Sequence, residues 1–397
     1  MGHRKRTSPL AELRWRFASA FFSIVHRSKP VRRAYWSVRE LFQLELRPRL
    51  LRFRARHVHG PRRIERARDE LLVASVVRDG ELYVGSFLDH YRRLGVRHFV
   101  FLDNGSTDRT VELLSGHDGV TVLRSSVPYR AYENAMKTYL VRRFSTGRWV
   151  LFADVDELFD YPFSYRLGLR DLLRYLEAHR YRAVVAQMLD MFSERPLAEP
   201  PSDLGDDLRS RYPLYDLSDV RKSPYPSRYS RGRLANPSIE FHSHGVRARW
   251  FGTANGLTKT CLFFVDDEIV PFTGWHHTKG ARLADFTGAL LHFPFVPSFR
   301  EKVRDEVASG RYGYYVTGEY RRYWDVIADG RTRLDPPPTA QRLDDLAALV
   351  DQGFLVVSDE YRSWVERYGT RGDSALGAQR SSARPRRRPF PVGEPTR

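Results

Sequence analysis

Between residues 70 and 156 the sequence alternates short apolar runs with longer segments of helical periodicity. Runs of strand length occur at 70–77, 97–104, 119–125 and 149–156, and helical segments separate them at 80–95, 106–117 and 134–145. Strands that alternate with helices are joined by right-handed crossovers and lie in one sheet. The sequence therefore predicts an α/β fold with a mostly parallel central sheet. Ser106 or Thr107 is expected to cap the second of these helices.

Polar residues follow two of the predicted strands at the point where each strand ends. Asp103 and Asn104 close the run RHFVFLDN, and Asp154 and Asp156 follow the run WVLFA. In open α/β sheets, ligands bind in the crevice at the carboxyl ends of the strands. We therefore expect the two groups of side chains to meet in one crevice.

The stretch GRWVLFADVDELFDYP places four carboxylates directly after an apolar strand. Such a stretch can be only a solvated turn or the start of a helix, where acidic side chains favour the positive end of the dipole. As alternate residues at a strand end, Asp154 and Asp156 can also reach one divalent cation, and oxygen ligands select Mg²⁺ or Mn²⁺ over zinc. The chain lacks G-x-x-x-x-G-K-[ST], and no G-x-G-x-x-G follows its first strand, so phosphate binding would fall to the metal.

Five motifs follow one another across roughly residues 70 to 310: VVRDGELYVGSFLDHYRRLGVRHFVFLDNGSTDRT, GRWVLFADVDELFDYP, VAQMLDMFS, GWHHTKG and ALLHFPFVPSFREKV. In this set and order the chain resembles a family 2-type glycosyltransferase of GT-A fold, in the branch that contains a D-x-D motif. The resemblance implies a GT-A-like nucleotide-diphospho-sugar transferase fold. It also implies a nucleotide-diphospho-sugar donor, a Mg²⁺ or Mn²⁺ ion, and a glycan or lipid-linked acceptor.

The resemblance further implies roles for individual residues of a nucleotide-sugar site. Asp103 and Asn104 match positions that line the nucleotide pocket, with Arg78 on the diphosphate side of that pocket. Asp154 and Asp156 match the D-x-D pair, of which one contacts ribose or metal and the second ligates the metal.

The chain departs from the family pattern after its first strand. Where Asn-Glu is usual, this sequence has Asp79-Gly80-Glu81. The additional glycine leaves the roles of Arg78 and Glu81 open.

Two histidines and two carboxylates complete the predicted site. His276 matches a family position and is expected as a third metal ligand or a diphosphate contact, whereas His292 is either a structural histidine or a site residue. An inverting transferase needs a carboxylate base that deprotonates the acceptor hydroxyl. Asp190, at the end of VVAQMLD, is the first candidate and Glu194 the second. The alternative for Asp190 is a salt bridge with an arginine.

Composition and the extent of the resemblance together divide the chain into four expected segments. They are a basic aromatic arm (1–69), the GT-A domain (70–300), a helical extension (301–370) and a disordered basic tail (371–397). The net charge of +18 is concentrated in the first and last segments, so the arm is expected either to pack on the catalytic domain or to contact an anionic membrane surface. A single cysteine excludes an internal disulfide, and no apolar run near the N-terminus is long enough to span a bilayer. We therefore expect a cytoplasmic protein, peripheral at the inner face of the membrane if the arm binds lipid.

Together these features predict a metal-dependent, inverting glycosyltransferase. Three other functions stay open at this point. Paired carboxylates also serve glycoside hydrolases, and arginines interleaved with aromatic residues also serve nucleic-acid binding, although no specific nucleic acid is expected. A transferase-like fold can also bind sugar without catalysis.

Overall fold

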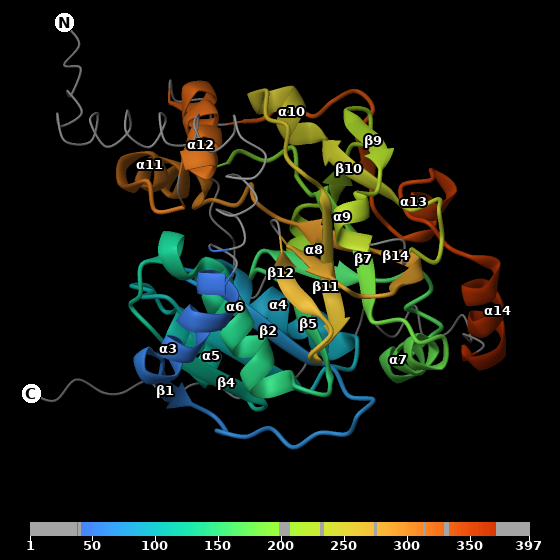
Figure 1. Ribbon diagram of the computed structural model, residues 1–397. Coiled ribbons are helices and arrows are strands. Elements are labelled where there is room, and N and C mark those ends of the chain that lie inside the picture. The colour runs from blue at the N-terminus through green and yellow to red at the C-terminus, as the bar shows by residue number, and fades with distance from the viewer. Residues whose placement is uncertain are drawn as a thin grey trace, which may run out of the picture.

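The computed structural model describes residue 38 and residues 41–197, 207–230, 234–273, 276–312, 314–328 and 333–370 (Figure 1). The expected disordered tail (371–397) and more than half of the expected basic arm lie outside the described residues.

A nine-stranded sheet with the order β1-β4-β3-β2-β5-β11-β7-β14-β6 forms the centre of the fold. Its strands are β1 (Arg56–His59), β2 (Leu72–Val77), β3 (His98–Asp103), β4 (Val120–Arg124), β5 (Trp149–Phe152), β6 (Glu157–Asp160), β7 (Ala183–Asp190), β11 (Thr258–Phe264) and β14 (Leu283–His292). Strands β4, β3, β2 and β5 pair in parallel, as do β7 and β14. Strand β11 is antiparallel to both β5 and β7, so these six strands share one direction, and β1, β11 and β6 run against them. The predicted α/β fold with a mostly parallel sheet is confirmed.

The helices of the described residues lie on both faces of this sheet and beyond its edges. They are α3 (Arg47–Arg54), which follows the π-helical turn η1 (Phe42–Leu46), α4 (Glu81–Arg93), α5 (Thr110–Ser115), α6 (Tyr129–Ser145), α7 (Leu169–Ala178), α8 (Leu208–Arg211), α9 (Ser227–Ser230), α10 (Val246–Phe251), α11 (Phe299–Ser309), α12 (Tyr314–Ile327), α13 (Ala347–Asp351) and α14 (Asp359–Tyr368). Three two-stranded sheets add β8 (Leu214–Tyr215) with β15 (Gln341–Arg342), β9 (Val220–Pro224) with β10 (Glu240–His244), and β12 (Val270–Thr273) with β13 (His277–Lys279).

Strand β2 shows why both faces need cover, because all of its residues are buried. Successive side chains of a strand point to opposite faces. Val73 and Val77 pack in the cluster that contains Phe87 of α4, whereas Leu72 belongs to the cluster that contains Leu140 of α6. A strand with helices on both faces needs apolar side chains at every position, which explains the continuous apolar run in the sequence.

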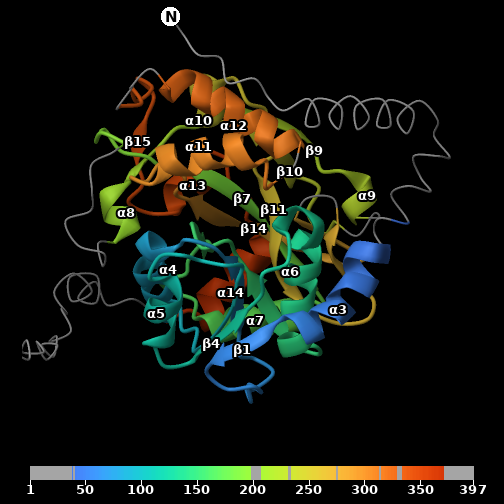
Figure 2. The same cartoon turned by 90° about the vertical axis from the view of Figure 1, so that its left-hand side faces the viewer.

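The C-terminal helices α11 and α12 lie above the sheet edge at which the parallel strands end (Figures 1 and 2). They pack with α10 through a separate cluster of aromatic side chains that includes Phe251, Phe295, Phe299 and Tyr323. Helix α14, by contrast, packs beside α7, away from this edge (Figure 1). The segment expected as a helical extension therefore contributes α11 and α12 to the crevice.

Two local expectations differ from the structure. Helix α5 begins at Thr110 after Arg109, and neither Ser106 nor Thr107 caps it, because both side chains bond to Asp79 instead. Strand β1 lies within the expected arm yet pairs with β4 in the main sheet. Residues 207–230 contain the short elements α8, β8, β9 and α9. In the parts of the chain that the structure describes, no helix is both long and apolar enough to cross a lipid bilayer.

Candidate active site

A cavity of about 890 Å³ opens at the carboxyl ends of β2, β3 and β5. Its walls come from the turn after β2, from α6, from the start of β11, and from α11 and α12. A volume of this size is in the range that holds a small-molecule ligand. Five of the residues predicted for the site line the cavity, namely Arg78, Asn104, Asp154, Asp156 and His276, whereas Asp103, Asp190 and Glu194 do not.

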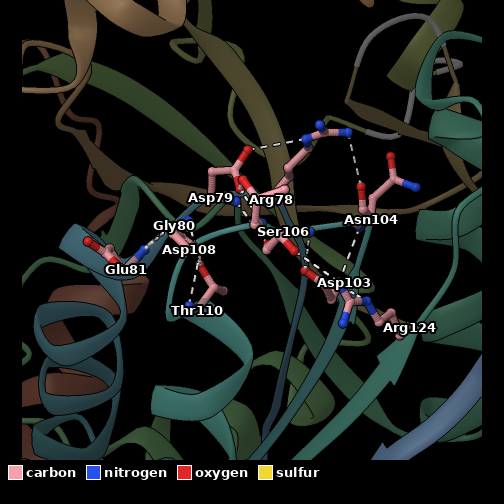
Figure 3. A network of polar contacts seen from close by, with 12 residues as sticks. Arg78, Asp79, Gly80, Glu81, Asp103, Asn104, Ser106, Asp108, Thr110 and Arg124 are labelled. Atoms are coloured by element: carbon pink, nitrogen blue, oxygen red, sulfur yellow. Dashed lines mark hydrogen bonds and ion pairs between the residues drawn. The ribbon is translucent and has the colours of Figure 1, made fainter.

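The turn after β2 and the turn after β3 are tied together by reciprocal hydrogen bonds (Figure 3). The Asp79 backbone N–H donates to Ser106 Oγ at 2.9 Å, and the Thr107 N–H donates to Asp79 Oδ1 at 2.7 Å. The Gly80 N–H donates to Thr110 Oγ1 at 2.7 Å. Each turn thus satisfies backbone groups of the other, which fixes their relative position at the mouth of the cavity.

The same contacts explain the departure Asp79-Gly80-Glu81. Gly80 is the residue before α4, and a Cβ atom there would lie 2.8 Å from Val77 Cγ2. The Glu81 carboxylate accepts from the Arg109 backbone N–H at 2.9 Å, and the Glu81 N–H donates to Asp108 at 3.1 Å. Glu81 therefore belongs to the linkage between the two turns and does not line the cavity.

Arg78 and Asn104 are the parts of these turns that reach the cavity. Arg78 Nη1 donates to the Asn104 backbone oxygen at 3.4 Å, and Arg78 Nε lies 3.2 Å from Asp79 Oδ2. The Asn104 amide donates to the backbone oxygens of Ser125 and Val127, both at 2.9 Å. Hydrogen bonds from Arg78 and Asn104 to backbone oxygens therefore hold the polar edge of the cavity in place.

Asp103 lies behind this edge and is completely buried. Its carboxylate faces Arg124 Nε at 3.0 Å and accepts from the backbone N–H groups of Gly105 and Ser106. The structure thus separates the predicted pair: Asn104 faces the cavity, and Asp103 shapes the turn from below.

The segment that carries Asp154 and Asp156 runs along the edge of the sheet. Strand β5 ends at Phe152 and β6 begins at Glu157, yet β11, β7 and β14 lie between them in the sheet. Residues 153–156 must therefore cross the ends of three strands. The Asp156 backbone oxygen accepts from the Phe293 N–H, just after β14, at 2.9 Å.

Two lysines face these carboxylates from other elements. Lys259 of β11 bonds to Glu157 Oε1, and its Nζ lies 3.5 Å from Asp154 Oδ2. Lys302 of α11 places its Nζ 3.4 Å from Asp156 Oδ2. The carboxylates of this edge are thus paired with cations from two separate elements, the strand β11 and the C-terminal helix α11.

The surroundings shift the pKa values of these groups in different directions. Burial raises the pKa of the Glu157 carboxyl, and Lys259 only partly opposes it. Burial acts the same way on Asp156, but Lys302, His292 and Lys259 together hold its pKa below the ordinary value. Asp156 is therefore ionised at neutral pH, as a metal ligand must be.

His276 lines the cavity on its α6 side. Its Nδ1 lies 3.4 Å from Nζ of the buried Lys137, which also bonds to Glu133 Oε1 at 3.0 Å. Burial, followed by the positive charge of Lys137, lowers the pKa of His276 well below its usual value, so the ring is neutral. Among the residues described, no three His, Cys, Asp or Glu side chains stand together as a metal-binding group, so His276 does not form one with the two aspartates.

Asp190 is buried at the end of β7, and both of its oxygens have partners. Oδ2 faces Arg247 Nε at 2.7 Å, and Oδ1 faces His292 Nδ1 at 2.6 Å. Burial raises the pKa of Asp190, but Arg247 and His292 outweigh it and hold the pKa below its ordinary value. His292, which lines the cavity, lies between Asp190 and Asp156, with Nε2 3.8 Å from Asp156 Oδ2. Glu194 is exposed beyond the strand.

Sequence reasoning found Arg78 but missed the other cations of the site. Lys259 had a detectable signal, since it is a charged residue just before the apolar run CLFFV, in a segment of strand length. Lys302 and Arg247 had none, because they lie on helices among many other basic residues and only the packing of α10 and α11 brings them to the cavity.

Comparison with known families finds a match in the central part of the chain. A family model described as glycosyl transferase family 2 matches residues 83–246, which include Asp103, Asn104, Asp154, Asp156 and Asp190. This match shows that residues 83–246 are similar to glycosyl transferase family 2, and it covers less than half of the chain. No curated protein matches the chain.

Two solved structures align with about a third of the chain. The crystal structure of S. aureus TarS 1-349 aligns at 20% identity over 31% of this chain and 36% of that chain, with a TM-score of 0.22. The crystal structure of a mycobacterial protein aligns at 24% identity over 32% of this chain and 42% of that chain, with a TM-score of 0.21. The chain thus spans less than half of either structure, and nothing about the site is transferred from them.

The linkage between the turns gives a first prediction. Replacing Gly80 by Ala forces a Cβ atom against Val77 and should lower the free energy of unfolding by about 1–3 kcal/mol, as overpacking does elsewhere. Gly116→Ala is the matched control, because a Cβ atom there meets its nearest neighbour at an ordinary 3.5 Å. Urea unfolding of both variants measures the difference. Equal stability of the two would show that the turn tolerates a side chain at position 80.

Proposed function

We propose that this protein is a metal-dependent, inverting glycosyltransferase that moves a sugar from a nucleotide-diphospho-sugar donor to a glycan or lipid-linked acceptor. The observation that carries the proposal is the cavity at the strand ends, whose wall brings Asp154 and Asp156 together with Arg78 and Asn104. All but Arg78 lie within the residues matched by the family 2 model.

The donor is proposed to lie along this wall. Its nucleoside rests against Asn104, whose turn Asp103 supports, and its diphosphate extends past Arg78 toward the aspartates. The chemistry of the donor set fits Mg²⁺ or Mn²⁺, because Asp154 and Asp156 are hard oxygen ligands that need phosphate oxygens and water to complete the coordination. The bound ion would neutralise the leaving phosphate.

His276 was expected as a third metal ligand or a diphosphate contact. Its place beside Lys137 favours the diphosphate contact, because the two side chains together present a donor-rich surface to an anion.

Removing the second aspartate tests the metal assignment. Asp156→Ala should abolish Mn²⁺-dependent binding of a nucleoside diphosphate, because the remaining Asp154 provides too few oxygen ligands. Titration calorimetry with UDP and GDP, with and without MnCl₂, measures this. Asp89→Ala, which removes an exposed carboxylate from α4, is the control and should bind as the parent does. Unchanged Mn²⁺-dependent binding in a folded Asp156→Ala variant would exclude the assignment.

Asp190 is the proposed carboxylate base, with Glu194 as the second candidate. Its support is its place at the end of β7, next to His292 on the cavity wall. Since Arg247 and His292 hold both oxygens, Asp190 would have to release one of these partners before it accepts a proton. The exposed Glu194 has no such constraint but does not line the cavity.

Asp190→Asn should separate binding from turnover. Donor affinity should survive, whereas the transfer rate should fall by about 10²–10⁴-fold, the usual share of general base catalysis. The variant should also lose roughly 1–3 kcal/mol of stability, because Arg247 loses the nearer of its two carboxylate partners and keeps only Glu319. Donor affinity, melting temperature and transfer rate are measured on the same preparation, at a temperature where the variant is folded.

Asp285→Asn is the matched control for this change. Asp285 is a buried carboxylate on β14 that accepts from Tyr175 and Ser358 and does not line the cavity. It should lose stability but keep its transfer rate. Turnover at the parent rate in Asp190→Asn would move the assignment of the base to Glu194.

A membrane-facing setting at the inner face of the cytoplasmic membrane is proposed from the described end of the basic arm. Phe42, Leu46, Leu50 and Phe53 are exposed on η1 and α3, and Phe53 is 82% exposed. Their spacing of four, four and three residues places them on one helical face. Exposed arginines surround them on α3, so the surface combines apolar and cationic groups, as helices that bind anionic bilayers do. The same segment bonds to α6, whose Tyr129 and Glu133 line the cavity.

Vesicle binding tests this surface. The double variant Leu50→Glu, Phe53→Glu should lose most co-sedimentation with vesicles that contain phosphatidylserine, because it replaces apolar area with negative charge. Neutral phosphatidylcholine vesicles should bind the parent weakly. The control Val58→Glu changes another exposed apolar residue nearby, outside the α3 face. Equal binding of the parent and the double variant would refute a membrane role for this face.

A further inference from the structure

Lys302 occupies an unusual position for a lysine. It lies on α11, outside the residues matched by the family 2 model, and its side chain lines the cavity. Its Nζ lies 3.4 Å from Asp156 Oδ2, and about a third of the side chain (35%) stays exposed. The Lys302 side chain thus reaches the proposed phosphate region from α11, on the side opposite to the sheet.

The charges around Lys302 leave it available for an anion. Three carboxylates (Asp154, Asp156 and Glu157) face two lysines at this edge, so the group carries one net negative charge without a ligand. A divalent cation on the aspartates turns this charge to one net positive. The attraction between Asp156 and Lys302 then becomes much weaker, because the metal neutralises the charge of Asp156.

The two lysines differ in how firmly they are committed. Lys259 bonds to Glu157, lies near Asp154, and its side chain is only 10% exposed. In the described part of the chain, Lys302 has a single carboxylate neighbour within ion-pair distance, at the long end of the range. Lys302 is therefore the cation that can exchange its partner at low cost.

The surroundings keep Lys302 charged. An ammonium group that keeps a third of its side chain in solvent and faces a carboxylate stays charged at neutral pH. Tyr83, Tyr312 and Tyr320 line the same cavity and carry no charge that would compete for the lysine.

We propose that Lys302 binds the diphosphate of the donor, so that the C-terminal helix α11 takes part in donor recognition together with the family 2 region. On binding, the Lys302 ammonium exchanges Asp156 for a phosphate oxygen and stabilises the negative charge that develops on the leaving nucleoside diphosphate. This inference rests on the proposed nucleotide-diphospho-sugar donor.

The test compares three variants of α11. Lys302→Met removes the charge but keeps most of the length, and Lys302→Arg keeps the charge. Arg304→Met is the matched control, because Arg304 loses the same charge from the same helix but is exposed and pairs with the neighbouring Asp305. UDP and GDP are titrated into each protein with MnCl₂ by calorimetry at two salt concentrations, and melting temperatures are recorded.

For whichever diphosphate the parent binds, Lys302→Met should weaken affinity at least tenfold and reduce its salt dependence. Lys302→Arg should stay within about threefold of the parent, and Arg304→Met should bind as the parent does. If the parent binds a diphosphate and Lys302→Met binds it equally well, the role of Lys302 is refuted while the donor assignment stands. Equal weakening in Lys302→Met and Arg304→Met also refutes it, since the effect would then be general charge. If the parent binds neither nucleotide, the donor assignment fails and the inference fails with it.

Discussion

The buried contact between Lys259 and Glu157 holds the site together. Residues 153–156 leave the middle of the sheet at β5 and rejoin it at β6 on its far edge, across the ends of β11, β7 and β14. This short segment crosses the strand ends and presents its carboxylates to the crevice. A contact with one of the crossed strands is therefore needed to fix its position. Lys259 supplies this contact from β11. Burying two such charges gains little net stability, but removing one partner would leave the other uncompensated at a cost of roughly 3–5 kcal/mol.

The carboxylates of this edge have distinct tasks because their surroundings differ. Glu157 is deeply buried, its pKa is raised, and it is committed to Lys259. Asp156 faces the cavity, and its cationic neighbours hold its pKa below the ordinary value. Asp190, at the end of β7, is held by Arg247 and His292. Within one acidic motif, Glu157 thus serves as an anchor and Asp156 faces the cavity, and Asp190 from another strand lies behind them.

The linkage of the turns after β2 and β3 shows how a departure from a family pattern is accommodated. The additional glycine in Asp79-Gly80-Glu81 lets the backbone approach Val77 closely and donate to Thr110. The carboxylates of Asp79 and Glu81 then accept hydrogen bonds from backbone N–H groups of the turn after β3. The polar wall used by the donor in our proposal is therefore built on hydrogen bonds that the sequence pattern alone does not reveal.

Local sequence patterns were enough to predict the alternation of strands and helices and the edge of the sheet at which the site lies. Apolar runs of strand length and helical periodicity depend on neighbours in the chain, so β2, α4, β3, β4, α6 and β5 could be predicted, and Asn104, Asp154 and Asp156 could be placed at strand ends. Tertiary structure decided which side chains meet. The antiparallel insertion of β11 brought Lys259 to Glu157, and the packing of α10 and α11 brought Arg247 to Asp190 and Lys302 to Asp156. These contacts join residues about 60 to 150 positions apart, and the pairing of charges over such distances leaves no local periodicity in the sequence from which it could be predicted.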